Sequence, residues 1–321
     1  MLKLKNIISY IKKHKLILMY LLISSFILYA LLTATLNTDN MMNLIFSILF
    51  IALVVFGFFI AYKNEKNKSL AQIKLLEWDS VAIIIGVVLT FSLVEFLSIP
   101  VIIASAAVGL AGHFLIKNYE VAIYCGSFAG MISPFIFNYG EVLILAFITA
   151  IYFIFTKRIL KGFGGKLGTT AFLGSITTAF ILNKSFFTFD IASKFYWLFI
   201  VSIIGVISTY LVQHKLDQTA VMASATTSIV FASILFVLGG NVIYSAVFFT
   251  ASFIGMSNKI IIPNIYVAFI SAIVLALVFY LFEPFFNGAG GKMGMMAFTS
   301  VVITTGIVKI NQLLVEKDEL S

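Results

Sequence analysis

Long apolar runs separated by short polar connectors make up most of this chain. The first run, Ile17–Leu36, holds about twenty mostly apolar residues, enough for a helix to cross a bilayer and more than the core of a cleaved signal peptide. A second run, Met41–Ala61, is followed by the basic connector Lys63–Lys74. Ten further apolar segments follow: Val81–Ile99, Val101–Ile116, Val121–Phe137, Val142–Phe155, Leu167–Leu182, Tyr196–Val212, Ala220–Leu238, Val242–Met256, Ile260–Phe282 and Met293–Ile310.

The composition agrees with this pattern. Of the 321 residues 61% are hydrophobic and only 11% are charged, and the mean hydropathy is +1.11, whereas a soluble domain carries about 25% charged residues. The chain is therefore an integral membrane protein. At about 1.5 Å per residue, several segments are short for a hydrocarbon layer of about 30 Å. We therefore expect some of them to be broken, tilted or re-entrant.

Most charged residues lie between the apolar runs or at their edges. The net charge of +8 comes from lysines scattered between the runs, which is typical of orientation signals and lipid contact rather than nucleic-acid binding. Residues 1–15 carry five lysines beside Leu4, Ile7, Ile8 and Ile11, a spacing that predicts an amphipathic helix on the membrane surface.

One motif occurs twice. The segment Gly162–Phe172 reads GFGGKLGTTAF and the segment Gly288–Phe298 reads GAGGKMGMMAF, so seven of eleven positions are identical at a separation of 126 residues. Three further pairs of segments match in the same order, at offsets of 119, 119 and 125 residues: Ile84–Phe91 with Ile203–Tyr210, Ala104–Ala106 with Ala223–Ala225, and Ser127–Met131 with Ser252–Met256. These matches predict a duplicated unit of five segments.

Because five is an odd number, the second copy must enter the membrane from the opposite side. With twelve segments and the N-terminus inside, 18 of the 21 Lys and Arg residues lie on inner connections, and only Lys184, Lys194 and Lys292 lie outside. If the segments containing Ser127 and Ser252 were re-entrant, the division would fall to fifteen against six. The positive-inside rule therefore favours twelve crossings.

We predict an all-α polytopic membrane protein of about 12 transmembrane segments, built as an N-terminal hairpin plus two inverted repeats of five segments. We expect it in the plasma (inner) membrane, with both termini cytoplasmic. The predicted divisions are an amphipathic segment and two-helix hairpin (1–62), a basic cytoplasmic connector (63–79), repeat 1 (80–182), an outer linker (183–194), repeat 2 (195–310) and a cytoplasmic tail (311–321).

The duplicated Gly-x-Gly-Gly-Lys-x-Gly motif precedes an apolar helix in each repeat. Glycines allow tight turns, and a helix N-terminus beside Lys166 or Lys292 favours an anion or a lipid headgroup. A tight turn at the membrane surface, with its lysine reaching the lipid headgroups, is the commoner explanation of such a motif. It is not a nucleotide-binding P-loop, because neither lysine is followed by Ser or Thr.

Residues near the duplicated Ser-Phe-x-Gly-Met segments are the predicted substrate site. Matching hydroxyls and small residues at the ends of broken helices can line a solute path, although they can also serve helix packing. Pro134 and Pro263, just beyond each segment, can break a helix. The predicted substrate-binding residues are Ser127, Phe128, Gly130, Ser252, Phe253, Gly255, Ser105, Ser224, Tyr119 and Tyr244.

Ionisable residues within a span are costly and are functional candidates by default. Glu95 is the clearest example, and we interpret it as a candidate for proton coupling, with a helix-end glutamate near water as the alternative. His113 lies near the inner end of its segment, and Glu141 and Glu283 lie at outer margins.

These features favour a membrane transport protein, a secondary transporter or facilitative channel, that moves a small polar solute or ion through the interface of the two repeats. A scaffold or accessory subunit that binds lipid or protein partners is the alternative. Three histidines, one cysteine (Cys125) and few buried carboxylates provide no nucleophile–base pair or metal cluster, so we expect neither an enzyme nor a cofactor or metal. The expected partners are the solute and membrane lipids, with no nucleic acid; a homo-oligomer stays open.

Overall fold

The computed structural model describes residues 19, 22–26, 28–29, 41–65, 77–190 and 193–318. The expected surface helix of residues 1–15 and most of the connector 63–79 lie outside these ranges. The regular secondary structure of the described part is helical, apart from one isolated β-bridge between Phe187 and Asn287. The helices are α2 (Met41–Glu65), α3 (Trp78–Leu97), α4 (Val101–Leu115), a 3₁₀ turn η1 (Lys117–Tyr119), α5 (Glu120–Ala129), α6 (Tyr139–Thr156), α7 (Lys166–Ile181), α8 (Phe195–Lys215), α9 (Ala220–Val237), α10 (Val242–Gly255), α11 (Ile265–Phe282) and α12 (Lys292–Asp318).

Among the described residues, six helices are long and apolar enough to cross a membrane: α3, α6, α8, α9, α11 and the part Lys292–Val315 of α12. The prediction of an all-helical, membrane-embedded chain is therefore confirmed at this level. The shortest members of the two expected sets of five are α5, with 10 residues, and α10, with 14. At about 1.5 Å per residue, neither reaches across a hydrocarbon layer of about 30 Å as a straight helix.

Apolar side chains on the outer helix faces are exposed, as contact with lipid requires. On α3 the exposed residues Val81, Ile85 and Leu89 recur every four positions and form one stripe. On α8, Ile200 and Ile204 are exposed at the positions 119 residues after Val81 and Ile85. The two helices therefore present equivalent faces to the bilayer.

The helix ends follow from local sequence signals. At the start of α6, Asn138 and Glu141 form a reciprocal capping box, in which each backbone N–H donates to the other side chain, at 2.9 and 3.0 Å. Asn264, 126 residues later, caps α11 by accepting from the backbone N–H of Val267 at 3.0 Å. α3 ends at Leu97, and its C-cap Ser98 has a φ of 51°, shortly before Pro100.

The chain divides into two compact units. The smaller unit contains α2, residues Thr156–Lys161 and the end of α12 from Val302. Within it, α2 crosses the end of α12 at glycines: a Cβ on Gly57 would lie less than 3.0 Å from the carbonyl oxygen of Val302, and one on Gly306 would lie 3.3 Å from that of Leu53. Small residues at such a crossing let two helix backbones approach closely, as is common in membranes.

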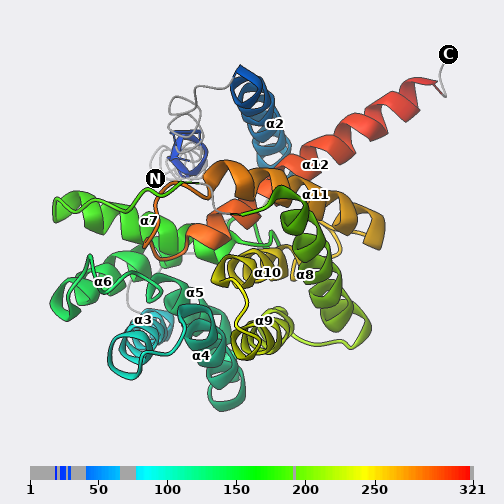
Figure 1. Ribbon diagram of the computed structural model, residues 1–321. Coiled ribbons are helices and arrows are strands. Elements are labelled where there is room, and N and C mark those ends of the chain that lie inside the picture. The colour runs from blue at the N-terminus through cyan, green and yellow to red at the C-terminus, as the bar shows by residue number, and fades with distance from the viewer. Residues whose placement is uncertain are drawn as a thin grey trace, which may run out of the picture. The chain divides into compact units, whose positions relative to one another are not determined.

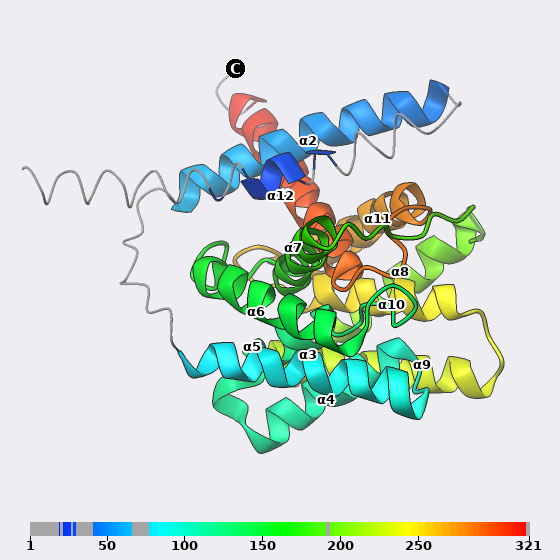
Figure 2. The ribbon, with the colours of Figure 1, turned by 90° about the vertical axis from the view of Figure 1, so that its left-hand side faces the viewer.

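The larger unit comprises Lys74–Phe155 and Gly162–Val301. Within it, α3 packs against α5 and α8 packs against α10, so the same pairing occurs in each half of the sequence. α4 and α9 lie side by side and join the two halves (Figure 1). Figure 2, turned by 90°, shows α3 along its length. The candidate site lies within this larger unit.

Candidate functional site

The duplicated glycine motifs meet at a buried crossing of α7 and α12. A Cβ on Gly165 would lie less than 3.0 Å from the carbonyl oxygen of Gly294 and the amide nitrogen of Phe298. A Cβ on Gly291 would meet the carbonyl oxygen of Gly168 and the amide nitrogen of Phe172 in the same way. Each motif thus touches the other through equivalent atoms, and a turn at the membrane surface would not allow these contacts.

The backbone before each helix repeats as well. Gly162 and Gly288 have φ values of 89° and 91°, and Gly165 and Gly291 have values of 78° and 81°, in the left-handed region that favours glycine. The carbonyl oxygen of Gly162 accepts from the backbone N–H of Asn258, and that of Gly288 accepts from the backbone N–H of Ser133, both at 2.9 Å.

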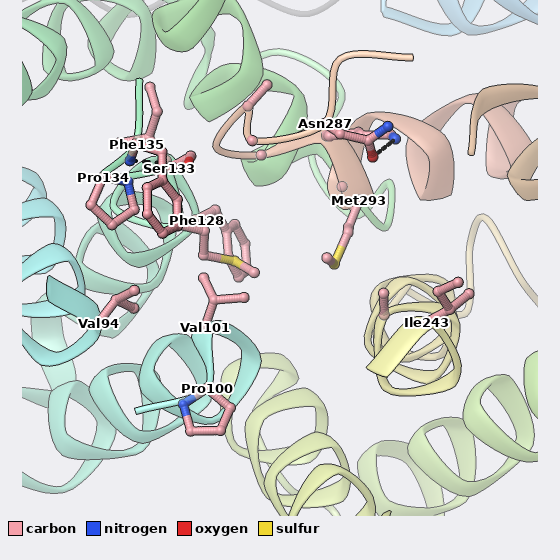
Figure 3. Close-up of a pocket in the computed structure, with 18 of the residues that line it drawn as sticks. Val94, Pro100, Val101, Phe128, Ser133, Pro134, Phe135, Ile243, Asn287 and Met293 are labelled. Atoms are coloured by element: carbon pink, nitrogen blue, oxygen red, sulfur yellow. Dashed lines mark hydrogen bonds between the residues drawn. The ribbon is translucent and has the colours of Figure 1, made fainter. Parts of the chain in front are cut away.

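A cavity of about 620 Å³ opens beside this crossing. Figure 3 shows Val94 and Val101 across the cavity from Ile243 and Met293. Most of its wall is apolar. It is lined by the end of α3, the start of α4, the loop after α5, the start of α10, and the loop that leads into α12: Val94, Glu95, Ser98, Ile99, Pro100, Val101, Phe128, Met131, Ile132, Ser133, Pro134, Phe135, Ile243, Ala246, Phe253, Phe279, Glu283, Asn287, Gly288, Ala289, Gly291, Lys292, Met293, Gly294 and Met296.

Four aromatic rings cluster at the wall of this cavity. Phe128 and Phe253 line it, with ring centroids 4.7 Å apart. Behind them, Tyr124 lies 4.3 Å from Phe128 and Phe249 lies 4.5 Å from Phe253. All four side chains are at most 1% exposed. Since Tyr124 precedes Phe249 by 125 residues, as Phe128 precedes Phe253, the two halves contribute equivalent rings. We call these four residues the aromatic quartet.

Charged groups of both signs lie in the apolar wall. The Nζ of Lys292, at the start of α12, donates to the carbonyl oxygen of Glu283 at 3.0 Å and to Oδ1 of Asn287 at 2.9 Å. The carboxylate of Glu283 accepts from the backbone N–H of Ser193 at 3.0 Å and from the Ser193 hydroxyl. Glu95 is exposed in the last turn of α3. The residues that line the cavity therefore include one lysine and two glutamates.

The predicted serines come together, but outside the cavity. Ser105 Oγ lies 2.9 Å from Ser127 Oγ, and Ser224 Oγ lies 2.8 Å from Ser252 Oγ. All four side chains are fully buried. The hydroxyl of Tyr124 reaches Ser224 Oγ at 3.0 Å and so joins the two halves. These hydroxyls hydrogen-bond to one another and to helix carbonyls, and their positions tie α4 to α5 and α9 to α10.

The other predicted residues are dispersed. Gly130 and Gly255 allow close packing, because a Cβ there would meet the carbonyl oxygens of Val87 and Val206 at less than 3.0 Å. Tyr119 lies in η1, and Tyr244 lies near the start of α10, with its ring 6.2 Å from that of Trp197. None of these four lines the cavity.

Lys166, at the start of α7, does not line it either, whereas Lys292 does. Sequence reasoning missed Asn287, Met293 and Pro100, which line the cavity. For Asn287, the one available signal was its position just before the duplicated motif.

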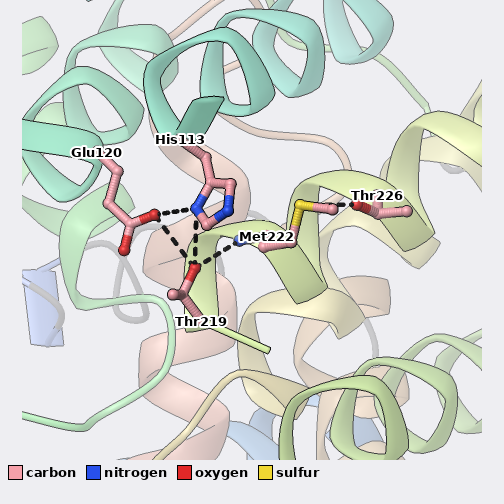
Figure 4. Close-up of polar contacts among 5 residues, drawn as sticks. All are labelled: His113, Glu120, Thr219, Met222 and Thr226. Atoms are coloured by element: carbon pink, nitrogen blue, oxygen red, sulfur yellow. Dashed lines mark hydrogen bonds and ion pairs between the residues drawn. The ribbon is translucent and has the colours of Figure 1, made fainter. Parts of the chain in front are cut away.

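A second polar cluster joins the halves at the other end of α4. His113 Nδ1 lies 2.5 Å from Glu120 Oε2, and the Thr219 hydroxyl lies 3.1 Å from that same oxygen and 3.3 Å from the histidine nitrogen (Figure 4). Thr219 is also the N-cap of α9, where it accepts from the backbone N–H of Met222. We call His113, Glu120 and Thr219 the polar latch, because they connect α4 and α5 to α9.

Within the described part of the chain, no group of three or more His, Cys, Asp or Glu residues could hold a metal ion. In comparisons with known proteins, no family model, no curated protein and no solved structure matches this chain.

Proposed function

We propose that this chain is a membrane transport protein that moves a small polar solute through the interface between two inverted repeats. One observation carries the proposal. The cavity is lined by Phe128 and Phe253, which are equivalent residues of the two halves and lie in contact with each other. The two halves also touch through equivalent atoms of the glycine motifs. Transporters built from inverted repeats hold their solute at such an interface, next to broken helices.

The reciprocal contacts support an inverted arrangement. Suppose that a residue of the first half touches a second-half residue, and that the repeat partners of these two residues also touch each other. Such reciprocal contacts relate the two halves by a two-fold axis. The glycine crossing and the Ser133–Gly288 and Asn258–Gly162 bonds have this form. So do the ring contacts of Tyr124 with Phe253 and of Phe128 with Phe249. A two-fold axis between halves of five segments each is consistent with opposite orientations in the membrane. The basic residues favour twelve crossings, with both termini cytoplasmic.

Under this topology the large cavity faces outward. Its rim contains the turn before Val101, the loop after α5 and the loop that begins at Glu283. In the twelve-segment arrangement all three connections lie on the outer side. The loop after α5 and the loop before α12 are non-helical stretches next to helix ends. In inverted-repeat transporters, such interruptions of a helix expose backbone groups to the solute.

The charges of the cavity favour a small zwitterion with an apolar body. A simple anion would meet the carboxylates of Glu95 and Glu283, and a simple cation would meet the ammonium group of Lys292. A solute with both charges can place its carboxylate near Lys292 and its ammonium group near Glu95. The apolar body can then rest against the rings of Phe128 and Phe253.

Uptake into vesicles tests this proposal. Purified protein in proteoliposomes should take up leucine faster than isocaproate or isoamylamine, which each lack one of the two charges. Lys292→Met should reduce leucine uptake about tenfold or more, because a hydrogen bond to a charged group contributes roughly 1.5–3 kcal/mol. Lys184→Met removes a lysine that pairs with Glu141 at 3.0 Å outside the cavity and should leave uptake unchanged. Equal uptake by empty liposomes, or equal loss in both variants, would contradict the proposal.

A further inference from the structure

A second hollow, of about 340 Å³, lies elsewhere in the larger unit. Its lining is polar and comes from the end of α8, the turn that follows it, and the loop after α10: Gln213, His214, Asp217, Gln218, Asn258 and Lys259. The sequence alone assigned no function to these six residues.

Every residue of this hollow is the repeat partner of a residue that lines the large cavity. At the offset of 119, the hollow's four residues from the end of α8 and its turn have partners in the cavity. Gln213, His214, Asp217 and Gln218 correspond to Val94, Glu95, Ser98 and Ile99, in that order. At the offset of 125, Asn258 and Lys259 correspond to Ser133 and Pro134.

The backbone agrees with this correspondence. Ser98 and Asp217 have φ values of 51° and 50°, so α3 and α8 end in the same left-handed turn. The hollow therefore occupies, in the second half, the place that the rim of the cavity occupies in the first.

We propose that this hollow is the second mouth of the solute path, open to the opposite side of the membrane, and that it takes the same class of small zwitterionic solute. The inference rests on the proposed transport function. The hollow again combines opposite charges, on Asp217 and Lys259. The aromatic quartet would then separate two mouths that are related by the two-fold axis.

An unpartnered polar atom supports a ligand in this hollow. The side-chain Oε1 of Gln213 is buried, and no hydrogen-bond donor reaches it among the described residues. A buried carbonyl oxygen without a partner is costly and rare in folded proteins. A rotation of the Gln213 side chain into the hollow would let an ammonium group or a water molecule provide the missing donor. The equivalent residue of the large cavity, Val94, has an apolar side chain that needs no hydrogen-bond partner.

The polar latch explains why the two mouths differ in size. Thr219 corresponds at the offset of 119 to Pro100, which cannot make the hydroxyl contacts of Thr219. His113 and Glu120 correspond to Ala232 and Ser245, at offsets of 119 and 125. The first half therefore has no equivalent of the latch at its own mouth, where Pro100 lines the open cavity. The latch holds α9 against α4 and α5 and narrows the second mouth.

A matched pair of cysteine variants tests the inference. In a Cys125→Ala background, which removes the one native thiol, Val94→Cys and Gln213→Cys place a thiol at equivalent positions of the two mouths. A membrane-impermeant methanethiosulfonate reagent should modify Val94→Cys from one side of the membrane and Gln213→Cys from the other. Each modification should slow leucine uptake at least tenfold. Gln218→Cys, on the rim of the same hollow, provides a second variant if Gln213→Cys does not fold.

The outcomes separate this inference from the proposed function. If modification blocks uptake in Val94→Cys but leaves it unchanged in Gln213→Cys and Gln218→Cys, the second mouth is wrong and the transport function stands. Modification of both positions from the same side of the membrane would overturn the second mouth and the inverted arrangement together. An absence of leucine uptake in the unmodified protein would overturn the proposed function itself.

Discussion

Replacing Gly165 or Gly291 by alanine is expected to prevent the larger unit from folding. Both residues have φ near 80°, where an L-residue costs roughly 1–2 kcal/mol. The added Cβ would also lie less than 3.0 Å from backbone atoms of the opposite motif, which cannot move as a flexible side chain can. Together these effects should cost more than about 4 kcal/mol, the exceptional end of single substitutions.

Size-exclusion chromatography of the detergent-solubilised variants measures this loss directly, since a misfolded membrane protein elutes as an aggregate. Gly140→Ala is the matched control. Gly140 lies in the first turn of α6, and a Cβ there would meet a single atom, Asn138 Oδ1, at an ordinary 3.4 Å. This variant should elute as the wild type does. A monodisperse, thermally stable Gly291→Ala protein would show that the two motifs do not cross as described.

Replacing Phe128 and Phe253 together by alanine is expected to open a leak through the protein. The two rings are at most 1% exposed and line the cavity where the two halves of the sequence meet. Without them, water and small solutes can pass a constriction that apolar rings keep dry. A reduction of the barrier by about 1.4 kcal/mol would already raise the leak tenfold. The measurement is the efflux of a preloaded small solute from proteoliposomes, in the absence of any gradient of the transported substrate.

Phe91→Ala controls for a general loss of stability in this experiment. Phe91 is equally buried, on α3, with its ring 5.8 Å from that of Tyr139, and it does not line the cavity. Each of these Phe→Ala changes should cost about 3–5 kcal/mol of folding stability. Efflux should therefore rise in the double variant alone. Equal efflux from both proteins would mean that the aromatic quartet is only a packed core.

Much of the fold can be predicted from the sequence, because a bilayer imposes a simple rule on long segments. The run predicted at Val81–Ile99 corresponds to α3, Trp78–Leu97, and the run at Ile260–Phe282 corresponds to α11, Ile265–Phe282. The rule fails where helices are broken. The run Val121–Phe137 contains only the short helix α5, because a non-helical stretch with Pro134 follows Ala129. Apolar content does not distinguish a helix from a loop buried in protein.

The candidate site was less accessible to sequence reasoning, for two physical reasons. Ser127 and Ser252 were selected because they match between the repeats, but a match is equally expected of residues that pack each repeat internally, and both are fully buried. The glycine motif was interpreted from its own local conformation. Its role as a crossing depends on contact between Gly168 and Gly294, 126 residues apart, which no local pattern contains.

The opposite orientation of the two repeats can be tested most directly by mapping equivalent connections. Lys117, between α4 and α5, and Leu238, between α9 and α10, are exposed. Intact cells that express Lys117→Cys or Leu238→Cys in the Cys125→Ala background would be treated with a membrane-impermeant maleimide. We predict that Leu238→Cys is labelled in intact cells, whereas Lys117→Cys is labelled only after permeabilisation. Labelling of both positions from the same side would contradict the inverted repeat and the solute path that depends on it.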